Sequence, residues 1–240
     1  MFGLVKPVGF DQKILLHQLD YTAKQSRKQS KKDMYALLDG FMRQDIAAPK
    51  SRKNTITILM KIWYNVPEEM KEIRDKVLQE FNDFTKEERL FAHWNMTMVA
   101  YPFFKDVVYE FGRLFQLQDS VQRSTIVKRM KDSYGERAKV QVASSAVMTT
   151  LREWETIVQS NKSNYIQNEK ILITNSLLQA LLVHTMLYVL EKDSLYTEMF
   201  LNHPLLFPFE IDLQVHELRE RKNEFAFHYQ GVEKLIVEKV

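Results

Sequence analysis

Residues 121–173 carry the pattern that most restricts the fold of this chain. Apolar side chains first recur at helical spacing, Gly135 then interrupts the pattern, and a second amphipathic stretch follows. In that second stretch, steps of three and four residues predict one buried stripe, made of Ala143, Val147, Leu151, Trp154 and Val158. Two helices joined at a glycine corner are the pattern of a helix–turn–helix.

A β-hairpin is predicted directly after the second helix. Tyr165-Ile166 and residues 170–173 flank Gln167-Asn168-Glu169 in the way that two short strands flank a turn. A helix–turn–helix followed by such a hairpin, or wing, is a winged helix. Residues 119–175 are therefore predicted to form a winged-helix-like segment.

The face of the second helix opposite the buried stripe is polar and carries no acidic residue. A recognition helix lays small polar and amide side chains in the DNA major groove, while basic neighbours hold phosphates. We therefore expect base edges or nearby phosphates to be contacted by Gln141, Ser144, Ser145 and Thr149. The DNA backbone would be neutralised by Arg137, Lys139, Arg152 and the wing residues Lys162 and Lys170. Because hydroxyl side chains make few bidentate base contacts, weak sequence preference and strong salt dependence are expected.

Positive charge is concentrated in two parts of the sequence. Residues 123–152 hold seven basic and two acidic side chains, a net charge of +5, although the whole chain carries only +3. Residues 24–61 reach +7, and the last fifty residues carry −4. Segregated charge of this kind indicates an anionic partner for one part of the molecule. A solvated helical surface is the alternative explanation for residues 24–61, in which Lys50, Arg52 and Lys53 complete the predicted DNA-binding set.

The composition favours a mainly α-helical protein. Six glycines and six prolines in 240 residues leave few positions for tight turns, and 45% hydrophobic residues suffice for a good core. The absence of cysteine excludes disulfides and thiolate zinc sites and suits a reducing cytoplasm, the expected location. No secretory signal is seen at the start of the sequence. The apolar window Leu177–Leu190 is shorter than the roughly twenty residues that span a bilayer, so we expect a buried core helix and no membrane partner.

Three regions are predicted along the chain. Residues 1–118 should form a helical N-terminal region, with two short helices, a polar basic connection at 49–54 and three further helices. Residues 119–175 follow as the winged-helix-like segment, and residues 176–240 as a helical region that ends in a small hairpin (EFAFHYQ, then LIVEKV). The aromatic stripe within 86–117 is expected to be core rather than a base-stacking platform.

Motifs for catalysis and metal binding are absent from the sequence, which has no glycine-rich phosphate loop, no HExxH and no His/Asp cluster at metal-ligand spacing. No catalytic residue, metal ligand or cofactor is therefore predicted. Lone histidines such as His93 and His184 are expected to be hydrogen-bonded residues of the core or its boundary. Arg221-(x6)-His228 matches the loose spacing of helical HEPN-type ribonucleases, but in strand-like sequence. An RNA-cleaving enzyme is kept as a third hypothesis.

Three segments between residues 30 and 190 occur in a recognisable order. They are the basic step Lys50–Thr55 before a helix, the helix Ala100–Leu117, and the segment that ends in ASSAVMTTLREWETIV. In this order the chain resembles the BrxA-type accessory proteins of BREX bacteriophage-exclusion systems. The resemblance implies a mostly helical, non-enzymatic component that binds double-stranded DNA beside a methyltransferase and other phage-defence proteins. Since that family is also similar to helical RNA-binding NusB-type folds, RNA stays open as a ligand, and the last fifty residues lie outside the resemblance.

Two functions from different classes fit these observations. The first is a sequence-tolerant double-stranded DNA-binding accessory protein in bacterial phage defence. The alternative is a protein–protein interaction scaffold whose helix–turn–helix packs on a partner, which the abundant methionine and aromatic residues and the acidic C-terminal fifth support. A continuous positive surface around residues 141–152 favours DNA, and a large apolar patch there favours a protein partner.

Overall fold

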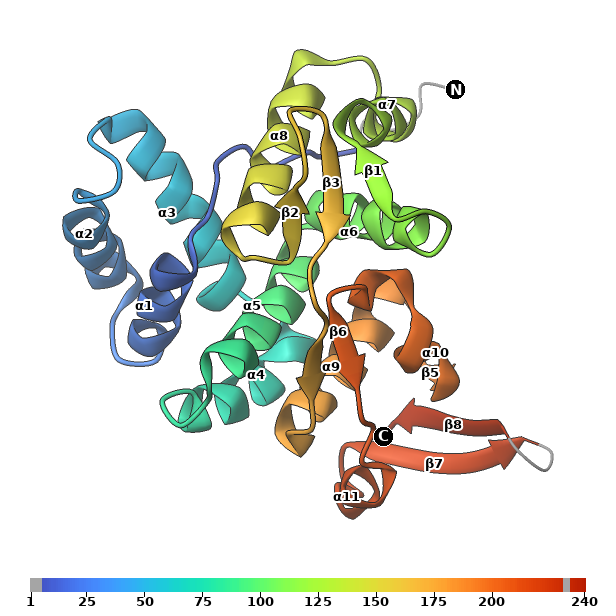
Figure 1. Ribbon diagram of the computed structural model, residues 1–240. Helices are drawn as coiled ribbons and strands as arrows, with labels where there is room; N and C mark the ends of the chain where they lie inside the picture. Colours follow the sequence, from blue (N-terminus) through green and yellow to red (C-terminus); the bar gives the residue numbers. More distant parts are fainter. Residues whose placement is uncertain (1–5, 231–233) are drawn as a thin grey trace, which may run out of the picture.

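Helices make up most of the part that the computed structural model describes, residues 6–230 and 234–240, which confirms a mainly α-helical fold (Figure 1). The first helices are α1 (Leu16–Ser26), α2 (Lys31–Met42), α3 (Pro49–Trp63), α4 (Glu68–Glu80), α5 (Lys86–Ala100) and α6 (Pro102–Phe115). They are followed by α7 (Arg123–Tyr134), α8 (Ala138–Glu153), α9 (Ser176–Leu190), α10 (Glu198–Asn202), the short 3-10 helix η1 (Pro204–Leu206) and α11 (Val215–Glu220).

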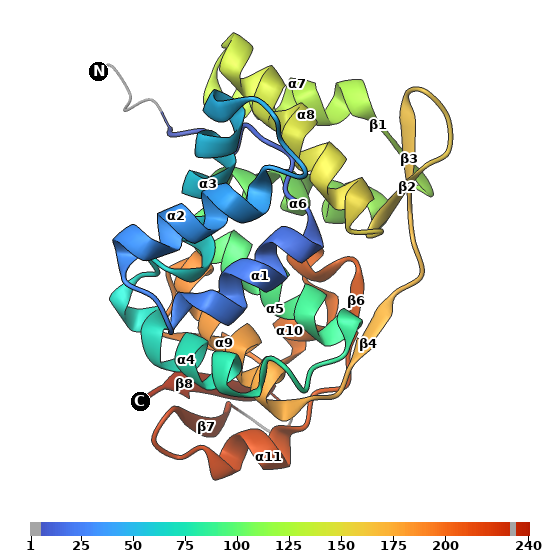
Figure 2. The ribbon, with the colours of Figure 1, turned by 90° about the vertical axis from the view of Figure 1, so that its left-hand side faces the viewer.

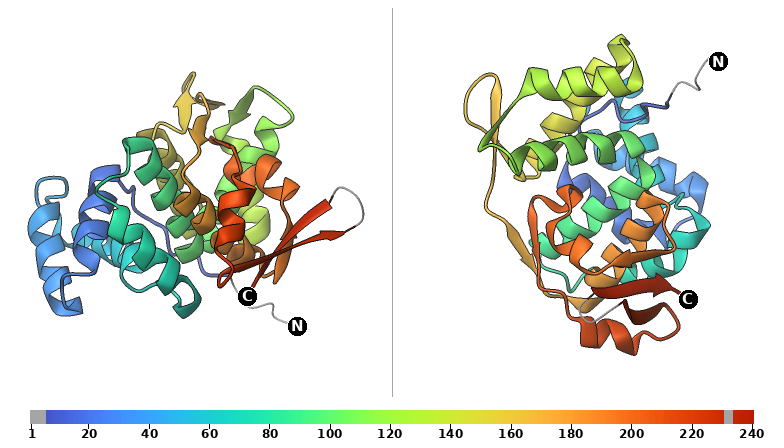
Figure 3. Two further views of the ribbon diagram at one scale, coloured as in Figure 1. Left: turned by 90° about the horizontal axis from the view of Figure 1, so that it is seen from below. Right: turned by 90° about the vertical axis from the view of Figure 1, so that its right-hand side faces the viewer.

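Short strands form three small sheets within the described residues. The first sheet is antiparallel with the order β1–β3–β2, from β1 (Ser120–Gln122), β2 (Ile157–Gln159) and β3 (Asn164–Gln167). In the second sheet, β4 (Ile171–Ile173) lies parallel to β6 (Phe209–Ile211). The third sheet has the order β5–β8–β7, from β5 (Ser194–Tyr196), β7 (Phe225–Gln230) and β8 (Lys234–Lys239). Figure 1 and the right-hand view of Figure 3 show the first sheet with α7 and α8 at one end of the molecule and the third sheet at the opposite end.

A cluster of large aromatic rings lies where helices from distant parts of the chain meet. The ring centroid of Trp94 on α5 lies 5.7 Å from that of Phe104 on α6 and 6.3 Å from that of Trp154, directly after α8. Phe207 and Phe209 lie 5.7 and 5.4 Å from Trp94 in edge-to-face contacts. Large buried rings contribute more apolar area to a core than other side chains do. Segments from the start, the middle and the end of the chain therefore share one core, and most of the predicted aromatic stripe belongs to it.

The segment before α1 is built into this core. Phe10 and Ile14 are fully buried. The backbone N–H of Ile14 donates to Thr150 Oγ1 (3.0 Å), and the Ile14 carbonyl oxygen accepts from the Trp154 indole N–H (3.0 Å). Figures 1 and 2 show this segment passing α8 on its way to α1. The backbone N–H and the carbonyl oxygen of Ile14 thereby hold the C-terminal end of α8 in place.

Helix α3 begins earlier than the sequence predicts. The polar stretch 49–54, predicted to be a connection, forms the first turns of α3 with Pro49 at the first helical position. Proline is favoured there because its fixed φ suits a helix and no intrahelical hydrogen bond is lost. Arg52 is only 8% exposed, since its Nε donates to Asp39 Oδ1 (2.6 Å) and its Nη1 donates to two backbone carbonyls of the loop before α3.

The hairpin after α8 differs from the predicted one. Its strands are β2 and β3, and in the loop 160–163 between them the Asn161 side-chain oxygen accepts two backbone N–H groups. Residues 171–173, predicted to be the second strand, form β4 and pair with β6 instead. The predicted turn at 167–169 is therefore wrong. Apolar runs of only two to four residues do not determine their own pairing partner, whereas an asparagine-stabilised turn determines where a hairpin reverses.

Two predictions about the C-terminal region are confirmed. Strand β7 pairs antiparallel with β8, as expected for a small hairpin, and β5 adds a third strand. Helix α9 is buried over most of its length, so it is the predicted core helix. Among the described helices, none combines the length and the apolar character needed to cross a membrane.

Replacing Trp154 by alanine should destabilise the fold by about 3–5 kcal/mol, because the change removes a large buried ring and leaves the Ile14 carbonyl without its donor. Chemical denaturation followed by circular dichroism measures the loss. Val158, which is 41% exposed on β2, provides the control, and Val158→Ala should change stability by less than about 0.5 kcal/mol. Equal denaturation midpoints for the two variants would contradict the anchoring role of Trp154.

A buried hydrogen-bond chain passes through His93 of α5. The Trp63 indole N–H donates to His93 Nδ1 (3.0 Å), so the ring proton sits on Nε2 and is directed to Asp20 Oδ1 (2.9 Å). Complete burial lowers the pKa of His93 despite the opposing effect of Asp20. Burial also lowers the pKa of His184 on α9, although its Nε2 lies 3.2 Å from a glutamate oxygen. Both histidines are hydrogen-bonded residues of the core or its boundary, as the sequence predicts.

Mild acid should therefore destabilise the fold before most carboxylates titrate. Burial lowers the pKa of both histidines in the folded protein, so below a pH of about 6.5 the unfolded chain binds more protons on them than the folded protein does. The free energy of unfolding is expected to be flat from about pH 8 to 7 and to fall from about pH 6.5 to 5, by at most about 1.4 kcal/mol per pH unit for each histidine. Urea denaturation at a series of pH values measures the profile. A free energy of unfolding that stays constant from about pH 6.5 to 5 would show that the pKa values of His93 and His184 are not lowered in the folded protein.

Candidate nucleic-acid interface

A basic groove lies between α7, the start of α8 and the loop 160–163. This α7–α8 groove has a volume of about 590 Å³ and is lined by Arg123, Ser124, Val127, Lys128, Lys131, Glu136, Gln141, Lys162 and Ser163. Four of these side chains are cations and one is an acid, which lies 2.9 Å from the ammonium of Lys131. Within the described part of the chain, Arg123, Lys128 and Lys162 have no acidic partner. The groove therefore presents net positive charge to a ligand.

Helix α7 is held with its other face against α6. Arg129 Nη1 donates to Glu110 Oε2 (2.9 Å), and the Tyr134 hydroxyl donates to Asp106 Oδ2 (2.8 Å). Burial raises the pKa of the Tyr134 phenol, so the phenol remains the donor in this pair. The buried residues of α7 recur at steps of four along this face, which leaves Lys128 exposed at the groove.

The turn between α7 and α8 has its corner at Gly135, as predicted. Gly135 has a φ of +89°, which glycine adopts without steric cost, and its N–H donates to the Lys131 carbonyl oxygen (2.7 Å). Arg137 closes the turn, because its Nη2 donates to the carbonyl oxygens of Tyr134 (2.8 Å) and Lys6 (3.0 Å). The guanidinium of Arg137 thus joins the turn to the N-terminal segment, in place of the phosphate contact that the sequence predicts.

Five of the predicted contact residues lie on the exposed face of α8. Lys139, Gln141 and Arg152 are exposed. Ser145 and Thr149 are half-buried, and their hydroxyls donate to backbone carbonyls one turn earlier in the same helix. The backbone of α8 thus accepts the proton of each hydroxyl, whereas the side chains of Lys139, Gln141 and Arg152 are exposed.

Side-chain hydrogen bonds join α8 to its neighbours at the groove. Arg123 Nη2 of α7 donates to Ser145 Oγ (2.8 Å). At the other end of α8, Arg152 Nη1 donates to Gln159 Oε1 of β2 (3.2 Å). Lys162 is exposed in the loop that follows β2. The first helix, the second helix and the hairpin therefore form one continuous surface.

Ser144 is the exception on α8. Its side chain is fully buried and its hydroxyl donates to the Val140 carbonyl oxygen (2.8 Å), so the predicted base contact is wrong. The buried arc of α8 is wider than the predicted stripe because α6, α7 and the N-terminal segment all pack against this helix. Val158, predicted to extend the stripe, lies beyond the end of the helix on β2 and is exposed.

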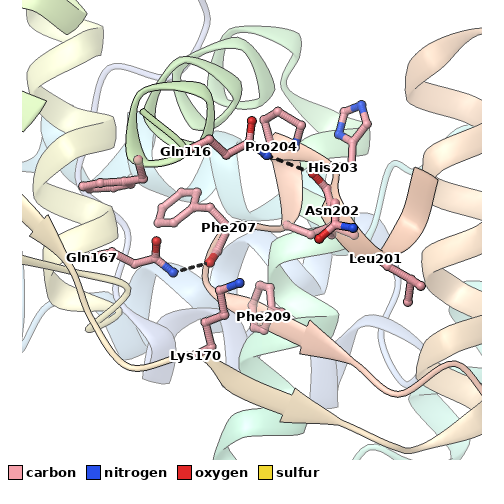
Figure 4. Close-up of a pocket in the computed structure, with 12 residues that line it drawn as sticks. Gln116, Gln167, Lys170, Leu201, Asn202, His203, Pro204, Phe207 and Phe209 are labelled. Carbon is pink, nitrogen blue, oxygen red and sulfur yellow. Dashed lines mark hydrogen bonds between the residues drawn. The ribbon is translucent and has the colours of Figure 1, made fainter. Parts of the chain in front are cut away.

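Lys170 lies outside the hairpin, in the link from β3 to β4, because the hairpin turns at 160–163 and not at 167–169. It is exposed at a second cavity of about 320 Å³, between the end of α6 and the segment around η1 (Figure 4). In the wall of this cavity Gln116 and Gln167 donate to backbone carbonyls. The prediction that Lys170 belongs to the wing is wrong.

Of the three residues at the start of α3 that the sequence predicts to contact DNA, two are exposed and one is buried. Lys50 and Lys53 are exposed on the first turns of the helix, and neither lines the α7–α8 groove. The guanidinium of Arg52 is occupied by Asp39 and by backbone carbonyls, so the predicted DNA contact of Arg52 is wrong. From the sequence alone, an arginine that donates hydrogen bonds to buried carbonyls cannot be distinguished from an arginine on the surface.

The structure adds Arg123, Lys128 and Lys131 of α7 to the groove. The sequence contains a signal for them, since they belong to the basic run 123–152 and alternate with the buried positions of α7. The sequence prediction omits these residues because it considers the second helix and the wing, whereas they lie on the preceding helix.

Within the described residues, no group of His, Cys, Asp and Glu side chains is arranged to hold a metal ion. Arg221 and His228, which share the spacing of HEPN ribonucleases, have different surroundings. Arg221 Nη1 donates to Glu224 Oε1 (3.2 Å), while His228 on β7 pairs with Glu238 on β8 (2.7 Å). HEPN sites lie on helices, so the position of His228 on a strand does not support an RNA-cleaving site.

Comparison of the chain with protein-family models, with curated proteins and with solved structures gives no match.

Replacing Arg52 by alanine should lower the melting temperature by roughly 4–8 °C. The change removes hydrogen bonds to two backbone carbonyls, each worth on the order of 1 kcal/mol, and 1 kcal/mol corresponds to about 2–4 °C in a chain of this length. Differential scanning fluorimetry measures the shift. Lys53→Ala removes an exposed cation from the same helix and should leave the melting temperature nearly unchanged. A similar melting temperature for both variants would refute the structural role of Arg52.

Proposed function

We propose that this chain is a non-enzymatic double-stranded DNA-binding protein that contacts a duplex with α8, the α7–α8 groove and the loop 160–163. The observation that carries the proposal is the groove itself. Arg123 and Lys128 of α7 and Lys162 of the loop line one opening beside Gln141 on the exposed face of α8. A helix inserted in a major groove is flanked by phosphates on both sides, and basic side chains next to such a helix neutralise them.

The order of elements supports the same function. The elements α6, β1, α7, α8, β2 and β3 follow one another, and their strands have the sheet order β1–β3–β2. This order matches that of winged-helix DNA-binding domains, in which the second helix of the helix–turn–helix enters the major groove. By this analogy α8 is the recognition helix and the loop 160–163 is the wing. The predicted contacts that fit this geometry are Lys139, Gln141, Ser145, Thr149, Arg152 and Lys162.

Phosphate contacts should dominate the affinity. Each phosphate that a protein cation neutralises releases counterions, so the logarithm of the binding constant falls by about 0.9 per phosphate for each decade of salt. Ser145 and Thr149 donate their hydroxyl protons to the backbone of α8, which leaves few groups for base-specific contacts. Binding should therefore be sensitive to salt and tolerant of most sequence changes.

The double variant Lys128→Ala/Lys162→Ala should bind duplex DNA more weakly and reduce the slope of log affinity against log salt by roughly two. Both side chains are exposed, so the fold should be unaffected. Fluorescence anisotropy with a labelled duplex of random sequence, titrated at several salt concentrations, measures the slope.

The double variant Lys31→Ala/Lys32→Ala provides the matched control. It removes the same charge from exposed positions at the start of α2, and it should keep the slope of the parent protein. An equal loss in both double variants would show that net charge, and not the groove, determines binding. No binding by the parent at low salt would refute the proposed function, and tighter binding of RNA than of duplex DNA would assign the groove to RNA.

The resemblance to BrxA-type proteins suggests the setting in which this binding would be used. We propose that the chain works in the bacterial cytoplasm with other phage-defence proteins. Affinity purification of the tagged chain from its own host, followed by mass spectrometry, tests this setting. Recovery of a DNA methyltransferase in stoichiometric amount supports it, and recovery of the chain alone argues against it.

A protein-interaction scaffold is supported by three exposed apolar side chains on α8 and the hairpin. Val142 lies on α8, and Val158 and Ile166 face each other across β2 and β3. Three such side chains expose less than the several hundred Å² that mark a protein interface. DNA binding is therefore the function that the surface near α8 supports better.

A further inference from the structure

Val142 is an apolar side chain on the otherwise polar exposed face of α8, and it is 55% exposed. It adds little to the core, and valine forms helices less readily than alanine or glutamine does. Gln141 precedes it and is exposed too. Valine gains little from packing or helix formation at this position, which leaves its methyl groups free to contact a ligand.

Gln141 and Val142 lie in the N-terminal part of α8. In a helix–turn–helix, the N-terminal residues of the recognition helix contact base edges. Gln141 lines the α7–α8 groove, and Val142, the next residue of α8, is exposed to solvent. Further along the face, Ser145 Oγ accepts from Arg123 and Thr149 donates to the helix backbone. Gln141 and Val142 are therefore the side chains at this end of α8 that are best placed to read bases.

The chemistry of these two side chains matches one kind of base pair. The major-groove edges of the four bases carry a single apolar group, the C5 methyl of thymine, and glutamine pairs in a bidentate way with N6 and N7 of adenine. We infer that Val142 packs against thymine methyls and that Gln141 bonds to adenine, so that the start of α8 selects A·T base pairs. This inference rests on the proposed DNA binding and adds one element of base preference to it.

Alternating copolymer duplexes test the inference, because each presents only one kind of base pair. The probes are poly(dA-dT), poly(dA-dU), which lacks only the methyl groups, and poly(dG-dC). At one salt concentration the parent protein should bind poly(dA-dT) about fourfold more tightly than poly(dA-dU), the factor expected from burying one methyl group. Poly(dG-dC) should bind more weakly than either.

Variants separate the two contacts. Val142→Ala should bring the ratio of the dT to the dU affinity close to one and leave the affinity for poly(dA-dU) nearly unchanged. Gln141→Ala should reduce the difference in affinity between poly(dA-dU) and poly(dG-dC). It should leave the ratio of the poly(dA-dT) affinity to the poly(dA-dU) affinity unchanged. Val158→Ala removes an exposed valine from β2 and should preserve both preferences. Because alanine is the better helix former, Val142→Ala should not melt at a lower temperature than the parent.

Two outcomes would overturn the inference and leave DNA binding intact. One is equal binding of the dT and dU copolymers by the parent, and the other is a thymine preference that survives Val142→Ala. A parent protein that binds none of the three duplexes at low salt would instead overturn the proposed function. A fourfold ratio that only Val142→Ala abolishes would establish the thymine contact.

Discussion

The orientation of α8 depends on how its C-terminal end is anchored. The Trp154 ring packs in the aromatic cluster around Trp94, and the Trp154 indole and the Thr150 hydroxyl bond both backbone polar groups of Ile14. A helix of 16 residues that is held in this way cannot turn about its axis without opening a close-packed core. The polar face of α8 therefore points in one direction, and Gln141 is kept beside α7. A surface on which base and phosphate contacts have fixed spacing requires such a rigid support.

Basic residues serve two purposes in this chain. Arg52, Arg129 and Arg137 direct their guanidinium groups at carbonyls and carboxylates within the protein. Several donors in a planar fork allow arginine to satisfy more than one buried acceptor. Lys128 and Lys162 keep their ammonium groups in solvent at the groove. The net charge counted over a stretch of sequence is therefore larger than the charge on the surface that a ligand would contact, because some of the cations are paired within the protein.

Long periodic patterns could be interpreted from the sequence, and short ones could not. The corner at Gly135, the buried helix α9 and the C-terminal hairpin all rest on patterns that extend over several residues on each side. Strands β2 and β4 have three residues each, and their partners are determined by distant parts of the chain. The roles of Arg52 and Ser144 likewise depend on elements that cover them from elsewhere in the sequence. Periodicity finds the core-facing stripe of a helix, but the width of the buried arc depends on how many neighbours pack around it.

The bonds between Ile14 and the end of α8 join residues 136 and 140 positions apart. During synthesis on the ribosome, the N-terminal segment emerges long before Thr150 and Trp154 exist. Its apolar side chains remain exposed to water until those residues have been made. Contacts between residues so far apart in the sequence slow folding. The two helices of the α7–α8 unit can form from local contacts, but the C-terminal end of α8 is fixed only when the segment around Ile14 docks against it. The segment around Ile14 therefore cannot complete its contacts until α8 has been synthesised.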